Sequence, residues 1–91
     1  MDYSIIPART MESLQRYVDH GVPVGGFLQA VLSNDLRKSI GRADSENLAA
    51  LVAIATWLYN EAPMACWGSP GAYDSWIQDH ITQNLTKGDD A

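Results

Sequence analysis

The chain has 91 residues with one cysteine, and its composition is 46% hydrophobic and 19% charged. This length supports one hydrophobic core and leaves no room for a second, and the hydrophobic fraction argues against an intrinsically disordered chain. The net charge of −5 is unevenly placed: residues 1–42 carry five cations and four acids, whereas residues 43–91 carry one lysine and seven acids. An acidic half disfavours direct reading of DNA or RNA, which needs a basic surface, and is compatible with a basic protein partner.

Three features of the sequence lead us to expect a cytoplasmic protein with no membrane segment. A single cysteine cannot form an internal disulfide, so nothing points to an oxidising compartment. Residues 1–4 lack the basic start and apolar run of a signal peptide. The longest apolar region, residues 48–59, is too short to span a bilayer.

The first predicted helix covers residues 11–20. An extended segment, residues 1–8, precedes it, and Thr10 is the expected N-cap. Gly21 is the expected stop, since glycine readily adopts the left-handed conformation that ends helices. The apolar residues of this segment share one stripe, which predicts packing against a core: Met11, Leu14, Tyr17 and Val18.

Helical spacing of apolar residues resumes at Phe27 and continues to Ile40. Residues 33–35, with the sequence Ser-Asn-Asp, interrupt it with residue types that prefer caps and turns. The sequence therefore predicts either a short helix to about residue 32 followed by a second from about residue 34 to 40, or one kinked helix.

The strongest helical pattern covers residues 45–60, with Asp44 or Ser45 as the N-cap. Its remaining faces are apolar as well, which is typical of a helix buried at the centre of its domain. Pro63 cannot continue a helix, so we expect the end near Asn60. The residues on its main stripe are Leu48, Leu51, Val52, Ala55, Leu58 and Tyr59.

The last predicted helix begins at Ser69-Pro70, a hydroxyl N-cap followed by proline in the first turn. Its apolar stripe comprises Tyr73, Trp76, Ile77, His80, Ile81, Asn84 and Leu85. We expect an all-α fold: a compact single domain, residues 1–85, with four to five short helices around a central apolar helix (about 45–60). Residues 86–91 are expected to form a flexible C-terminal tail.

The only cysteine, Cys66, lies beside Trp67 in a loop rich in proline and glycine. A nucleophilic cysteine needs a base and a lowered pKa, and no motif of a cysteine enzyme flanks this one, so we interpret Cys66 as a packing residue. The two histidines, His20 and His80, do not stand at metal-ligand spacing with it. We therefore predict no catalytic residue, no metal and no cofactor.

One candidate for small-molecule binding is the glycine pair Gly25-Gly26. Together with Arg37, Lys38 and Arg42 it would hold an anion such as a phosphate. The surrounding sequence, GVPVGGF, lacks both common phosphate-binding glycine patterns, and a proline-stiffened turn is the competing interpretation.

A second candidate surface is aromatic and acidic. Trp67 stands in a loop rich in proline and glycine, where it is either a lid on the core or an anchor for a partner. Tyr59 lies near the end of the predicted helix that precedes this loop. The acids Glu61, Asp74 and Asp79 of the acidic half would face a basic surface on that partner.

Three motifs carry a resemblance that covers residues 6–77: GFLxAVLSNDL at 26–36, ADxxN at 43–47 and LYNEAPxxCWGS at 58–69. With these motifs the chain resembles a family of small phage and prophage accessory proteins of unassigned activity. The resemblance implies a phage-borne protein acting in the cytoplasm of a bacterial host, where such proteins often counter host defences stoichiometrically, either by binding a defence protein or by sequestering a signal molecule.

The sequence thus leads to two functional hypotheses. The first is a non-enzymatic binding protein, such as an anti-CRISPR-type inhibitor, that binds a host protein with a basic surface. The alternative is a homo-oligomer that binds or sequesters a nucleotide-like small molecule at Gly25, Gly26, Arg37, Lys38 and Arg42.

Overall fold

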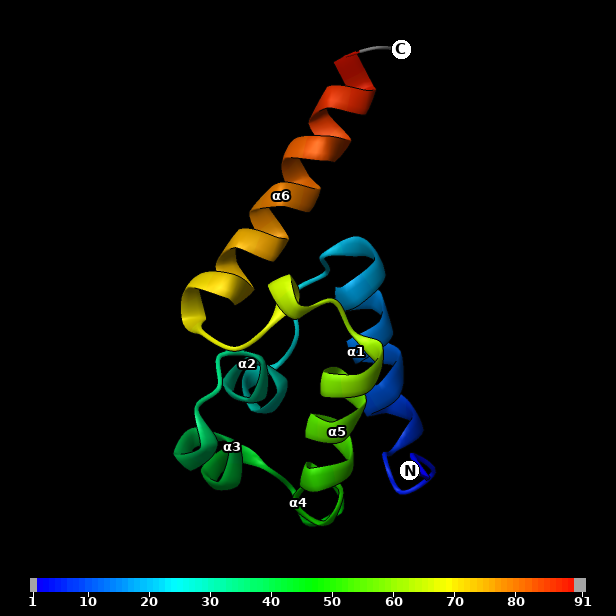
Figure 1. Ribbon diagram of the computed structural model, residues 1–91, viewed down its shortest axis with the longest axis vertical. Helices are drawn as coiled ribbons and strands as arrows, with labels where there is room; N and C mark the ends of the chain where they lie inside the picture. Colours follow the sequence, from blue (N-terminus) through cyan, green and yellow to red (C-terminus); the bar gives the residue numbers. More distant parts are fainter. Residues whose placement is uncertain (1, 90–91) are drawn as a thin grey trace.

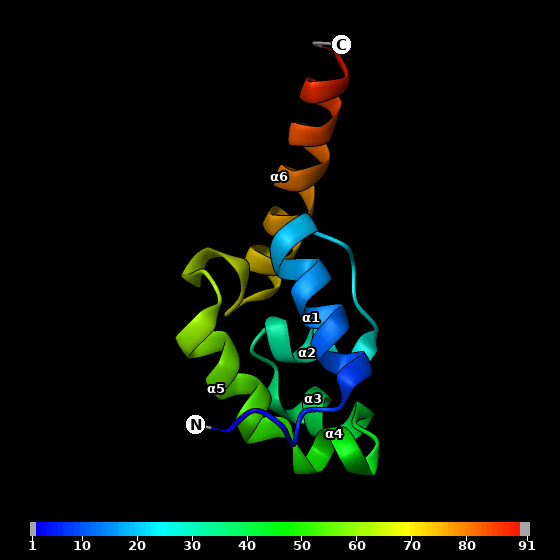
Figure 2. The same ribbon diagram turned by 90° about the vertical axis from the view of Figure 1, so that its right-hand side faces the viewer.

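In the computed structural model, residues 2–89 are described, with side chains through residue 83. Within this range the chain forms six α-helices, one 3-10 turn and no strand, which confirms the all-α prediction. Figures 1 and 2 show that the last helix extends away from the others, and the longest dimension is 45 Å against 24 and 20 Å for the other two. The elements are α1 (Ala8–His20), α2 (Gly26–Leu32), α3 (Leu36–Arg42), α4 (Ser45–Ala49), α5 (Leu51–Glu61), η1 (Met64–Cys66) and α6 (Pro70–Asp89).

Tyr17 lies at the centre of the core and joins three elements. Its ring stacks on that of Tyr73 of α6 at a centroid distance of 5.3 Å. Its hydroxyl donates to the carbonyl oxygen of Cys66 at 2.7 Å, while its own carbonyl accepts from the Trp76 indole at 2.8 Å. Because the ring and hydroxyl are fully buried and paired, they fix α1 against both η1 and α6. The other largest fully buried side chains are Leu14, Leu32, Ile54, Leu58, Cys66 and Ser39.

Helix α1 begins earlier than predicted and does not use Thr10 as its cap. It starts at Ala8, directly after Pro7, whose φ of −56° and ψ of 143° end the extended segment. Thr10 is instead buried inside the helix, where its hydroxyl donates to Asn47 Oδ1 of α4 at 2.7 Å. The N-cap prediction was wrong because this tertiary hydrogen bond occupies the hydroxyl.

Gly21 ends α1 as predicted, with a left-handed φ of 67° and its N–H donating to the Tyr17 carbonyl at 2.8 Å. Helix α6 crosses close to this point. A Cβ at position 21 would lie 2.6 Å from Cβ and Cγ of His80, so only glycine permits the approach.

Residues 27–40 form two helices, which settles the alternative left open by the sequence. Asn34 has a left-handed φ of 61°, the Asn34 N–H donates to the Val31 carbonyl at 3.0 Å, and the Asp35 N–H donates to the Ala30 carbonyl at 2.9 Å. This is the Schellman pattern of helix termination. The Asp35 side chain then accepts from the Lys38 N–H at 3.0 Å and caps α3.

The helix predicted for residues 45–60 is broken at Ala50, where ψ is 0°. Asp44 caps α4 by accepting from the Asn47 N–H at 2.8 Å, as one of the two predicted caps. The expectation that α5 is buried on every side was wrong: Ala53, Ile54 and Leu58 enter the core, whereas the opposite face is exposed. The other helices of this short chain cover one face of α5 and leave the opposite one bare (Figure 2).

Helix α6 begins at Pro70, and the Ser69 hydroxyl accepts from the Ala72 N–H at 3.0 Å, as predicted. The helix continues to Asp89, so residues 86–89 of the predicted tail are helical, and residues 90 and 91 lie outside the described residues. The predicted stripe positions 84 and 85 have no described side chains. No helix in the described part of the chain combines the length and apolar character needed to cross a bilayer.

Candidate functional site

Two adjoining hollows lie along the exposed face of α5, lined also by residues of α3 and of the η1 segment. Their volumes are about 270 and 500 Å³, and they share Asn34 and Trp67. We call the combined surface the Trp67 groove. Its principal lining side chains are Leu36 from α3, Val52, Ala55 and Tyr59 from α5, and Met64 and Trp67 from the η1 segment and the residue after it.

The apolar side chains around the Trp67 groove are unusually exposed. The exposed fractions are 65% for Leu36, 71% for Val52, 80% for Tyr59 and 89% for Met64. Single exposed apolar residues are normal on a protein surface, but a contiguous group beside a hollow is typical of an interaction site. The groove therefore has the composition of a site that is covered in some state of the protein.

The polar groups within the groove are largely used by the chain itself. The Ser39 hydroxyl donates to the Asp35 carbonyl at 2.7 Å, and the Thr56 hydroxyl donates to the Val52 carbonyl at 2.7 Å. The Asp35 carboxylate caps α3. An occupant would therefore be held mainly by shape and apolar contact, with few directional hydrogen bonds.

Trp67 is positioned by its two neighbours. Cys66 is fully buried behind it, and the Gly68 N–H donates to the Leu32 carbonyl at the end of α2 at 2.8 Å. Gly68 has a φ of 116°, a conformation that glycine supports. Trp67 packs against the core, as the lid interpretation expects, and it also lines the groove, while its role as an anchor for a partner stays a prediction.

Cys66 has the packing role predicted for it. Its side chain is fully buried in the core, and burial raises the pKa of its thiol to about 11. A thiol with this pKa is almost entirely protonated near neutral pH, which is the reverse of an activated nucleophile.

The predicted partner-binding residues separate into two groups. Tyr59 and Trp67 come together in the groove, whereas Glu61, Asp74 and Asp79 are exposed elsewhere and do not line it. The two aspartates lie on α6, and Glu61 is the last residue of α5.

The predicted anion-binding residues are partly brought together. Gly25, Gly26 and Arg42 line a hollow of about 350 Å³ together with Arg9. The Arg42 guanidinium lies directly over Gly26, where an added Cβ would be 3.2 Å from Nη1. Lys38 and Arg42 line a separate hollow of about 150 Å³. Arg37 is exposed and lines none of these hollows.

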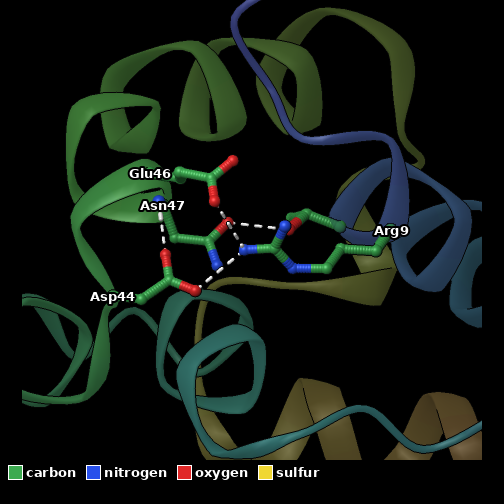
Figure 3. Close-up of polar contacts among 5 residues, drawn as sticks. Arg9, Asp44, Glu46 and Asn47 are labelled. Carbon is green, nitrogen blue, oxygen red and sulfur yellow. Dashed lines mark hydrogen bonds and ion pairs between the residues drawn. The ribbon is translucent and has the colours of Figure 1, made fainter.

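Two carboxylates already pair with Arg9, one of the two arginines that line the larger hollow. Figure 3 shows Arg9 pointing between two carboxylates, with Nη2 2.9 Å from Asp44 Oδ2 and 3.6 Å from Glu46 Oε1. The pKa of Asp44 is lowered, chiefly by the hydrogen bond from the Asn47 N–H and further by Arg9. Since Arg9 already has these partners, Arg42 is the cation that this hollow offers to an anion.

The two histidines and the cysteine occupy unrelated environments. His80 donates from Nδ1 to the Trp76 carbonyl at 2.8 Å, His20 is exposed on α1, and Cys66 is in the core. Among the described residues, no three side chains of His, Cys, Asp or Glu are grouped so that they could hold a metal ion.

Sequence reasoning assigned three groove residues to other roles or to none. Val52 was placed on a buried stripe, Leu36 was counted in the apolar helical spacing, and Met64 was not singled out. The signal that could have found them is the number of apolar faces on residues 45–60, which exceeds what so short a chain can cover.

No protein-family model, curated protein or solved structure matches this chain, so its function has to be inferred from its own surfaces.

Proposed function

We propose that this chain is a small non-enzymatic binding protein that holds an apolar element of a protein partner in the Trp67 groove. The observation that carries the proposal is the group of four exposed apolar side chains along two adjoining hollows, of about 270 and 500 Å³, that share Trp67. Aromatic side chains at the centre of such a surface usually supply most of the binding energy.

The phage context belongs to the same proposal and rests on the resemblance carried by the three motifs. The motif at 26–36 contributes Asn34 and Leu36 to the groove, and the motif at 58–69 contributes Tyr59 and Trp67. Two of the three motifs that carry the resemblance to phage accessory proteins therefore meet at one surface. We accordingly propose a counter-defence role, including anti-CRISPR-type inhibition, through stoichiometric binding to a host protein in the host cytoplasm.

The exposed acids have a separate part in this proposal. Glu61, Asp74 and Asp79 lie outside the groove and supply a negative field in the half of the chain that lacks arginine. Such a field raises the rate of encounter with a basic partner and makes that rate dependent on salt, while the groove governs dissociation.

The test is capture of a partner from host lysate by the tagged protein, followed by quantitative binding to the purified partner. Tyr59→Ala removes an exposed ring, so it should leave folding intact and weaken binding by about tenfold or more. Ile5→Ala, which truncates an exposed apolar residue that does not line the groove, is the matched control. Unchanged binding of Tyr59→Ala would exclude the groove as the binding surface.

Charge reversal tests the second part. A triple variant should associate with the partner more slowly at low salt and dissociate at nearly the same rate. Its substitutions are Glu61→Lys, Asp74→Lys and Asp79→Lys. An equal effect at low and high salt would show that these acids make direct contacts instead of supplying a field.

The hollow beside Arg42 favours one alternative function, a homo-oligomer that binds a nucleotide-like anion. Gly25, Gly26 and Arg42 line that hollow, whereas Arg37 and Lys38, which belong to the same predicted set, do not. A nucleotide at 100 times its dissociation constant would stabilise the fold by about 2.7 kcal/mol, and Arg42→Ala should abolish that shift. The absence of any thermal shift across nucleotides and cyclic nucleotides would reject this alternative.

A further inference from the structure

We infer that in the free protein the Trp67 groove is covered by the same groove of a second copy, in a weak dimer with two-fold symmetry. The inference goes beyond the proposed function: a partner would then have to displace the second copy before it binds. It rests on the shape, charge and area of the surface around α5.

The surface around α5 carries a ridge beside two hollows. Val52 and Tyr59 stand seven residues apart on α5, two helical turns along one face, and both project strongly into solvent. Val52 borders the hollow lined by Leu36 and Trp67, and Tyr59 borders the adjoining hollow lined by Met64 and Trp67. A two-fold axis that passes between the ridge and a hollow would place each ridge in the other copy's hollow.

The charge distribution favours a second copy over a basic partner in the groove itself. Two copies with a net charge of −5 each repel one another, so a contact between them has to exclude the acids. Asp35 is the one charged residue among those lining the groove, and its carboxylate is already engaged as the cap of α3. The acids Glu61, Asp74 and Asp79 lie outside, where solvent and salt screen them.

The apolar area matches a weak dimer. A large aliphatic or aromatic side chain presents roughly 100 Å² of apolar surface when fully exposed. Given their exposed fractions, the four side chains Leu36, Val52, Tyr59 and Met64 present about 300 Å² per copy. The smallest specific interfaces bury up to about 600 Å² per partner, of which about 60% is apolar, and this area is similar. We therefore expect a dissociation constant of roughly micromolar to a few hundred micromolar.

The experiment is sedimentation velocity on the whole protein over a concentration series spanning that range. The wild type should pass from monomer to dimer as its concentration rises. Val52→Asp places a charge on the ridge and should weaken dimerisation at least tenfold, because the carboxylate would be buried in the interface. Val22→Asp, the same substitution at an exposed valine outside the groove, should leave the dimer unchanged.

Circular dichroism of both variants checks the fold, and Tyr59→Ala provides a second groove variant that adds no charge. A wild type that stays monomeric at every concentration overturns the inference, as does a dimer that Val52→Asp and Tyr59→Ala leave intact. A monomer whose groove is occupied only when a host partner is added has the same consequence. The proposed function is tested separately, by the sensitivity of partner capture to Tyr59→Ala.

Discussion

Gly21→Ala tests the contact between the end of α1 and α6. Gly21 has a φ of 67°, and a Cβ there would lie 2.6 Å from Cβ and Cγ of His80. The left-handed conformation costs a non-glycine residue about 1–2 kcal/mol, and overpacking costs about 1–3 kcal/mol more. We expect a total loss of about 2–5 kcal/mol, which lowers the melting temperature of a domain this size by about 10–40 °C.

The control is the same substitution at Gly41. This glycine is inside α3, and a Cβ there would contact nothing within 4 Å, so Gly41→Ala should stabilise the fold by about 0.5–1 kcal/mol. Thermal and denaturant unfolding of both variants, followed by circular dichroism, measures the expected loss of stability in Gly21→Ala and the expected gain in Gly41→Ala.

A double-mutant cycle separates the two causes of the Gly21 effect. His80→Ala keeps the Cβ at 2.6 Å, so it is not expected to rescue Gly21→Ala fully. In a His80→Gly background the clash is removed, and Gly21→Ala should cost only the conformational part, about 1–2 kcal/mol. An equal cost in the wild-type and His80→Gly backgrounds would refute the argument that α6 presses on the end of α1.

Three further predictions concern single features of the fold. Asn34→Val should destabilise by about 1–2 kcal/mol because of the left-handed φ at that position, whereas Asn34→Gly should be close to neutral in urea unfolding. Cys66 should resist alkylation near neutral pH in the native protein and react readily in denaturant, because it is buried with its thiol pKa raised to about 11; rapid native labelling would contradict its packing role. The lowered pKa of Asp44 means that its ionised form stabilises the fold above the ordinary value of 3.8 and that this contribution is lost as pH falls through the lowered pKa. The stability difference between wild type and Asp44→Ala should therefore be smaller at about pH 2 than at about pH 6, and a constant difference would exclude the carboxylate as its source.

The sequence predicted those helix boundaries that local chemistry determines. Gly21 ends α1, Ser69 and Pro70 start α6, and Asp44 caps α4, because each of these residues satisfies a helix end through its own backbone or side chain. The Thr10 cap was mispredicted because a distant residue, Asn47, accepts from its hydroxyl. Residues with two available partners cannot be assigned by local pattern alone.

The sequence also identified some residues of the candidate site but not their arrangement. Tyr59 and Trp67 were singled out as aromatics near a loop, and they do line the groove. The acids were grouped with them only because they share the acidic half of the chain, and the structure places them outside the groove. Net charge is a property of composition, whereas a binding surface depends on which side chains share a face.

By itself, the sequence determined an all-α chain, the chemistry of its helix ends and the packing role of its cysteine, because periodicity and capping act over a few residues. Only the tertiary structure decided which face of α5 remains uncovered. That depends on which of the other helices reach it, and Val52 and Ile54 look equally apolar in the sequence. One is 71% exposed and the other fully buried because a helix buries only the faces that its neighbours reach.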